Sequence, residues 1–83
     1  MKLVIHMIEL EIDIYTVIAV NIKRYRIIRG MTQAVLAERV GVSHEFIRRI
    51  ESKKGQKTFS IETIYKISLV LDITMNDLFN CNT

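Results

Sequence analysis

The chain has 83 residues, which suffice for one small domain with a single hydrophobic core and leave no room for a separate catalytic domain. Hydrophobic residues make up 49% and charged residues 25%, a balance typical of a soluble globular domain and too apolar for disorder. The formal net charge is +3, but residues 17–58 alone hold ten Lys or Arg against three Glu, an excess of +7. This basic segment indicates a polyanionic partner, because each neutralised phosphate releases counterions; a simply solvated basic face is the alternative.

The first 20 residues are apolar enough to be tested as a signal peptide or a membrane span. Glu9, Glu11 and Asp13 interrupt them, so the apolar run is only about eight residues long, and no small-residue cleavage site follows. A membrane span needs roughly 20 apolar residues. The single Cys81 can form no disulfide within the chain, which fits a reducing compartment. We therefore expect a soluble, cytoplasmic protein with no membrane partner.

Residues 1–14 are expected to form an N-terminal extension. Within it, residues 8–14 (IELEIDI) alternate strictly between apolar and acidic side chains, which is typical of a strand. Four apolar side chains would lie on one face: Ile8, Leu10, Ile12 and Ile14. Because the chain offers no second strand, we expect this segment to pair with its copy in a homodimer. Two alternatives stay open, a backward extension of the first helix or a tail if translation begins at Met7, and a dimer interface at the last helix, around Met75 and Phe79, is the fallback.

The helical pattern begins at about residue 15. The first helix is expected over residues 15–29, with Ile18, Ile22 and Tyr25 on its inner face and Gly30 after its end. Thr32 is the expected N-cap of a second helix that ends at Gly41, a residue suited to the left-handed conformation. The inner face of this second helix would hold Leu36, Ala37 and Val40.

Three more helices follow, each with a hydroxyl residue at its start. Ser43 is expected to cap a third helix whose inner face holds Ile47 and Ile50. Ser60 should cap a fourth, with a buried stripe of Ile61, Ile64, Ile67 and Leu71. Thr74 and Asp77 have the spacing of a capping box for a fifth, in which Met75, Leu78 and Phe79 supply apolar contacts. The predicted fold is therefore an all-α, five-helix domain over residues 15–79 with a tail at 80–83.

The stretch TQAVLAERVGVSHEFIRRIE, residues 32–51, resembles the helix-turn-helix of the Cro/phage-repressor (XRE) family. The family pattern is filled by Gln33, Ala37, Gly41, Ile47 and Ile50. A small residue at position 37 allows close helix crossing, glycine at 41 suits the turn, and the two isoleucines hold the second helix of the motif against the core. The flanking segments also resemble the family, so that the resemblance covers residues 18–79.

The resemblance implies a set of functional residues. Base edges in the DNA major groove would be read from the third helix by Ser43, His44, Glu45, Arg48, Arg49 and Ser52. Phosphates would be held by Gln33, Lys53, Lys54, Lys57 and Thr58. Arg26 and Glu51 would form the family's structural ion pair, with two solvated surface charges as the alternative. Phe46 is expected to pack at the domain edge, with contact to a thymine methyl as the alternative. The loop after residue 52 departs from the family pattern, with Phe59 where proline is common.

The sequence shows no catalytic, metal-binding or cofactor-binding constellation. Its two histidines lie 38 positions apart, and it has no glycine-rich phosphate loop. The function that we predict is therefore not enzymatic: a sequence-specific regulator of transcription, a repressor or autoregulator that binds a palindromic operator in double-stranded DNA as a homodimer. The alternative is an antitoxin-like or accessory module that binds a protein partner, including a controller of a restriction and modification pair.

Overall fold

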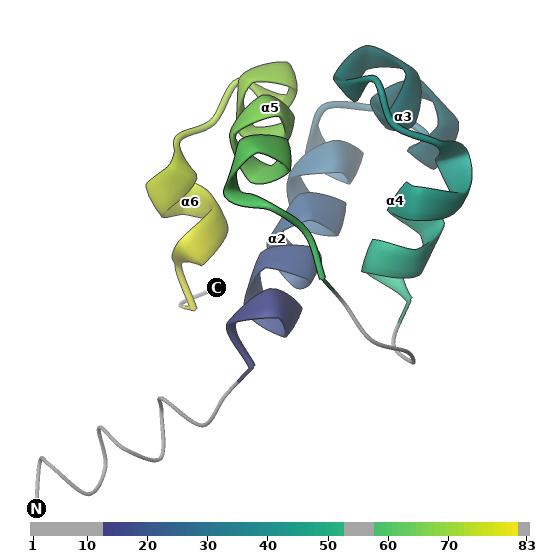
Figure 1. Ribbon diagram of the computed structural model, residues 1–83. Helices are drawn as coiled ribbons and strands as arrows, with labels where there is room; N and C mark the ends of the chain where they lie inside the picture. The colour runs from purple at the N-terminus through teal and green to yellow at the C-terminus, as the bar shows by residue number, and fades with distance from the viewer. Residues whose placement is uncertain (1–12, 53–57, 82–83) are drawn as a thin grey trace, which may run out of the picture.

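The computed structural model describes residues 13–52 and 58–81, which form five helices (Figure 1). These are α2 (Ile14–Ile28), α3 (Gln33–Val40), α4 (His44–Glu51), α5 (Ile61–Leu71) and α6 (Met75–Phe79). The all-α fold expected from the sequence is confirmed for this part of the chain. Among the described helices, none has the length and apolar character that crossing a bilayer requires.

Side-chain caps mark the start of every one of these helices. The Asp13 side chain accepts a hydrogen bond from the backbone N–H of Tyr15, and α2 therefore begins at Ile14. The remaining starts are capped by the residues expected from the sequence: Thr32, Ser43, Ser60 and Thr74. At α6 the capping box is complete, because Thr74 accepts from the Asp77 N–H while the Asp77 carboxylate accepts from the Thr74 N–H.

Three residues with positive φ, Gly30, Gly41 and Asp72, let the chain turn sharply between the described helices. Gly41 ends α3 with φ +89°, and its N–H donates to the carbonyl of Ala37, so the chain can enter α4 within three residues. Asp72 ends α5 with φ +57°, a conformation that aspartate tolerates better than most residues with a Cβ. These short connections hold α3 against α4 and bring α6 back beside α2.

The core lies where the inner faces of all five helices meet. Its buried apolar residues are Ile18, Ala19, Ile22, Leu36, Ala37, Val40, Ile47, Ile50, Ile64, Ile67, Leu71 and Leu78. Removing such side chains from water is the main stabilising contribution to a domain of this size. Ala37 of α3 is 2% exposed, so a larger side chain at this position would have to displace its neighbours in the core.

Two expectations, one about the burial of Ile61 and one about the structure at Ile14, were wrong. Ile61 was placed on the buried stripe of α5, but it is 77% exposed, because it occupies the first helical position beyond the end of the core, and Ser68 is buried on the stripe instead. Ile14 was placed at the end of an N-terminal strand, but it is the first residue of α2, since Asp13 caps the helix there. The other positions of that strand, Ile8, Leu10 and Ile12, lie outside the described residues.

Candidate nucleic-acid interface

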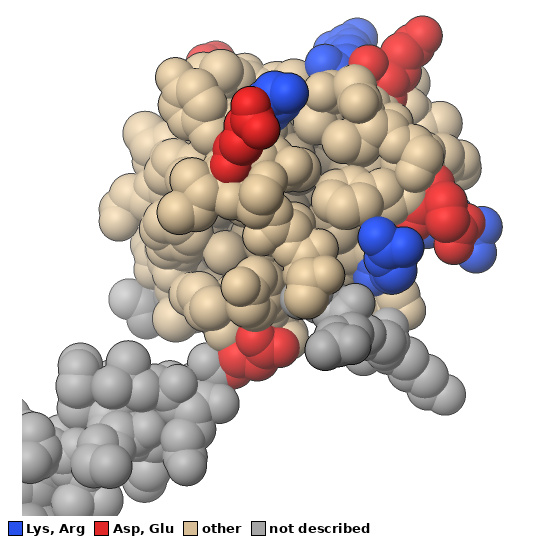
Figure 2. Space-filling model, in the orientation of Figure 1, with Lys and Arg blue, Asp and Glu red and all other residues tan. Residues whose placement is uncertain are grey.

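The α3–turn–α4 unit presents one face of α4 to solvent. The opposite face is anchored, since Ile47 and Ile50 are essentially inaccessible. The residues on the outer face are all exposed: Ser43, His44, Glu45, Arg48, Arg49 and Ser52. Four of them, Glu45, Arg48, Arg49 and Ser52, line a shallow polar depression. Figure 2 shows both basic and acidic side chains at the right of the view, on the side of the molecule where α4 lies in Figure 1.

The two arginines of α4 are held in different ways. Arg48 pairs with Glu45 across one turn, with 3.2 Å between Nη1 and Oε1, and both side chains are more than half exposed. An ion pair this exposed contributes at most about 1 kcal/mol, so a phosphate can readily replace the glutamate. The Arg49 guanidinium instead lies over the Phe46 ring, 5.5 Å from its centroid. Because Phe46 packs against the core, as expected, its ring gives Arg49 a stable support.

A buried ion pair ties α2 to the end of α4. Arg26 donates from Nε to Oε2 of Glu51 at 2.7 Å and from Nη2 to Oε1 at 2.8 Å. Its third contact is a 2.7 Å hydrogen bond from Nη1 to the Met31 carbonyl. Only 1% of the Glu51 side chain and 11% of the Arg26 side chain are exposed. The structure thus brings together the two residues singled out as an ion pair, with the bidentate geometry that makes such pairs strong.

Gln33, at the start of α3, joins the same network. Its Nε2 donates to Oε1 of Glu51 at 3.0 Å, and the residue is half-buried. This contact orients the Gln33 side chain, whose amide nitrogen carries a second hydrogen. Of the other expected phosphate ligands, Thr58 is exposed, whereas Lys53, Lys54 and Lys57 lie outside the described residues.

Two polar residues that position these helices, Arg29 and Asn21, were not predicted from the sequence. Arg29 donates to the carbonyls of Leu71 and Asp72 at 2.7 and 3.0 Å and so binds the C-terminal end of α5. Asn21 is buried, and its Nδ2 donates to the Leu78 carbonyl at 2.7 Å. Asn21 lies three positions after Ile18, on the face expected to be buried, and this spacing could have predicted a buried polar residue. Arg29 carried no such signal, since it was one cation among ten.

The described residues show no group of three or more His, Cys, Asp or Glu side chains that could hold a metal ion. What they do show is a short helix packed across a glycine turn against a second helix whose outer face is polar and basic. Two helices in this arrangement form a helix-turn-helix unit. Proteins of the helix-turn-helix class place the second helix of this unit against DNA.

Comparison with known proteins agrees with this class. A helix-turn-helix family model matches residues 22–78, and the chain belongs to that family, in its XRE-type branch. It is 37% identical to the HTH-type transcriptional regulator SinR of Bacillus licheniformis over 60 residues, which cover 72% of this chain and 53% of SinR, about half of its length. It is 41% identical over 59 residues to an uncharacterized HTH-type transcriptional regulator of Archaeoglobus fulgidus, covering 71% of this chain and 81% of that protein.

The fold is also seen in a solved structure. The crystal structure of the hypothetical transcription factor NHTF from Neisseria superposes with a TM-score of 0.74 at 24% identity, over 82% of this chain and 76% of that one. The family match and the shared fold make this chain a member of the helix-turn-helix family, and the relatives that it matches are named transcriptional regulators.

Proposed function

We propose that the protein binds a specific DNA sequence by placing the outer face of α4 in the major groove. The observation that carries the proposal is the division of α4 into two faces. Ile47 and Ile50 hold it against the core, while Arg48 and Arg49 are exposed, Arg48 beside the exposed Glu45 and Arg49 over the Phe46 ring. An arginine side chain can donate two hydrogen bonds to O6 and N7 of guanine, so a rigid helix that presents arginines is suited to reading base edges.

The exposed residues around α4 divide into candidates for base contacts and candidates for phosphate contacts. Ser43, His44 and Glu45 stand at the N-terminal end of α4, the part of a recognition helix that approaches base edges most closely. We assign base contacts to Ser43, His44, Glu45, Arg49 and Ser52, the exposed residues of α4 and its caps. Arg48 is assigned to either a base or a phosphate, because a phosphate can replace Glu45 in its exposed ion pair. We assign phosphate contacts to Gln33, Thr58 and the three lysines Lys53, Lys54 and Lys57. Phosphate contacts position the protein, whereas base contacts give it specificity.

We further propose that the protein binds a palindromic operator as a homodimer. There it acts as a repressor, or as an autoregulator of its own transcription. An eight-residue recognition helix contacts only a few base pairs, so a single domain defines a short site. Two copies related by a two-fold axis double the length of the site that is read. None of the contacts within the described residues favours the antitoxin-like or accessory module, which would use the fold to bind a protein partner.

Selection of bound fragments from a random DNA pool, at a stated salt concentration, tests this proposal. We expect enrichment of an inverted repeat whose half-site centres lie about 10 base pairs apart, one helical turn. Affinity for the selected site should exceed that for random DNA by about a thousandfold or more. A pool with no enriched sequence, together with equal affinity for all fragments, would contradict sequence-specific binding and favour the protein-binding alternative.

A further inference from the structure

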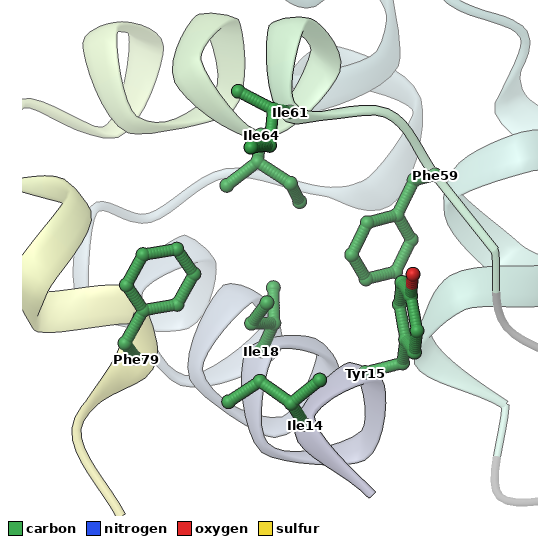
Figure 3. A pocket seen from close by; sticks show the side chains of 7 residues that line it. All are labelled: Ile14, Tyr15, Ile18, Phe59, Ile61, Ile64 and Phe79. Carbon is green, nitrogen blue, oxygen red and sulfur yellow. The ribbon is translucent and has the colours of Figure 1, made fainter.

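An apolar pocket opens where the first turn of α2 meets the start of α5 and the end of α6 (Figure 3). Ile18 and Ile64 are buried side chains at its base, and Ile14, Ile61 and Phe79 stand around it. Its volume is about 170 Å³. Apolar cavities of roughly 150 Å³ hold a group the size of benzene, so this pocket has room for one or two apolar side chains.

The wall of the pocket is already assembled in the single chain. Tyr15 of α2 and Phe59, which precedes α5, pack edge to face with their ring centroids 5.2 Å apart. This contact joins residues 44 positions apart in sequence and fixes one side of the opening. A ligand would therefore enter a formed pocket, with little further ordering of the chain.

The rim of the pocket leaves large apolar side chains in water. Ile61 is 77% exposed, Ile14 46% and Phe79 40%, and all three belong to the same opening. Exposed apolar residues are ordinary when they are scattered, but a contiguous group around a pocket marks an interaction site. In Figure 2 charged side chains leave a broad area of this face uncovered, which fits an apolar occupant.

Residues 1–12 are an occupant with the required chemistry and position. They read MKLVIHMIELEI and are dominated by Leu, Ile, Val and Met. They lead directly to Asp13, the cap of α2, and the next two residues, Ile14 and Tyr15, line the pocket. Twelve extended residues span up to about 40 Å, so they can reach well beyond the domain to which they are attached.

The join at Asp13 argues against occupancy of the pocket by the same chain. Asp13 has extended backbone angles, φ −66° and ψ 111°. A return onto the pocket beside it would require a tight reversal within residues 1–12, yet these contain no glycine, proline, asparagine, aspartate or serine, the residues that favour such turns. We infer that residues 1–12 of one copy occupy the apolar pocket of a second copy, and that the exchange is reciprocal. This inference rests on the homodimer proposed above and names its joining surfaces.

Disulfide trapping in the full chain tests the exchange directly. Cys81 is the only cysteine, so Cys81→Ser gives a background without thiols. One preparation carries Val4→Cys, Ile8→Cys or Leu10→Cys, and a second carries Ile61→Cys at the rim of the pocket. Mixing the two under mild oxidation should give a cross-linked heterodimer on a denaturing gel. A preparation with Leu69→Cys, an exposed position of α5 that does not line the pocket, is the matched control for random collision.

The possible results separate exchange from its alternatives. Cross-linking to position 61 well above that to position 69, with at least one of the three N-terminal cysteines, supports exchange. Equal yields at both positions overturn it. A chain that carries both an N-terminal cysteine and Ile61→Cys tests self-occupancy. If its thiols are lost but no dimer-sized band appears on the denaturing gel, each chain fills its own pocket.

A second measurement uses the dimer dissociation constant. We expect Ile61→Lys to raise it by about tenfold or more, since a charge then faces apolar side chains, while Leu69→Lys changes it little. Sedimentation of both variants measures the change. A dimer unaffected by Ile61→Lys overturns the exchange and leaves the proposed dimer in place. A wild-type chain that stays monomeric yet selects a half-site overturns both the exchange and the homodimer, but not sequence recognition by α4.

Discussion

Replacing Glu51 by alanine is expected to lower the free energy of unfolding by about 3–5 kcal/mol, because it leaves a buried arginine without its counter-charge. Glu51 accepts two hydrogen bonds from Arg26 and one from Gln33, and its side chain is almost fully buried. Small domains are stable by only about 5–15 kcal/mol, so the variant should lose a large share of its stability. Urea denaturation followed by circular dichroism measures the change.

A matched control and a double-mutant cycle show whether the loss belongs to the ion pair. Glu38→Ala removes an exposed glutamate from α3 and should change stability by less than about 0.5 kcal/mol. Arg26→Ala and the double variant complete the cycle, in which a large favourable coupling between the two residues is expected. Additive losses, or a Glu51→Ala variant as stable as Glu38→Ala, would mean that the pair does not tie α2 to α4.

Arg49→Ala should weaken binding to the selected site by about 1–3 kcal/mol and relax the preference at one base pair. The guanidinium loses its hydrogen bonds to a base, whereas the helix keeps its position, because Ile47 and Ile50 anchor it independently. Binding to a panel of single-base variants of the site, compared between wild type and Arg49→Ala, measures both effects.

Lys53→Ala is the matched control for a cation assigned to phosphate. It should weaken binding to specific and random DNA to a similar extent and reduce the slope of log affinity against log salt by about one. Arg48→Ala should behave in the same way if its exposed pair with Glu45 gives way to a phosphate. Equal losses on specific and random DNA for Arg49→Ala would instead assign that residue to the backbone.

The helices were predictable from the sequence because their signals are local. Hydroxyl residues precede α3, α4, α5 and α6, and each does cap the helix that follows it. The core stripes of α2, α3 and α4 follow from spacing alone, since residues three or four apart share a helical face. Ile61 was misplaced for the same reason: spacing defines a face, but it does not say where along that face the core ends.

Features of the candidate interface that depend on contacts distant in sequence were harder to predict. The roles of Gln33 and Arg29 arise from partners 18 and 42 positions away, and nothing in the neighbouring residues specifies those partners. The same holds for the pocket between α2, α5 and α6, whose wall joins Tyr15 to Phe59. Arg26 and Glu51, 25 positions apart, were singled out only because the sequence resembles a family in which such a pair occurs.

The claim that α4 reads base edges in the major groove is tested most directly by combining Arg49→Ala with a change in one DNA atom. Replacing a guanine of the selected half-site by 7-deazaguanine removes the N7 acceptor from the major groove and preserves base pairing. If Arg49 binds that guanine, each change alone should weaken binding, and the double-mutant cycle should show a coupling of about 1–3 kcal/mol at one guanine. Strictly additive losses at every guanine of the half-site would contradict base recognition by Arg49.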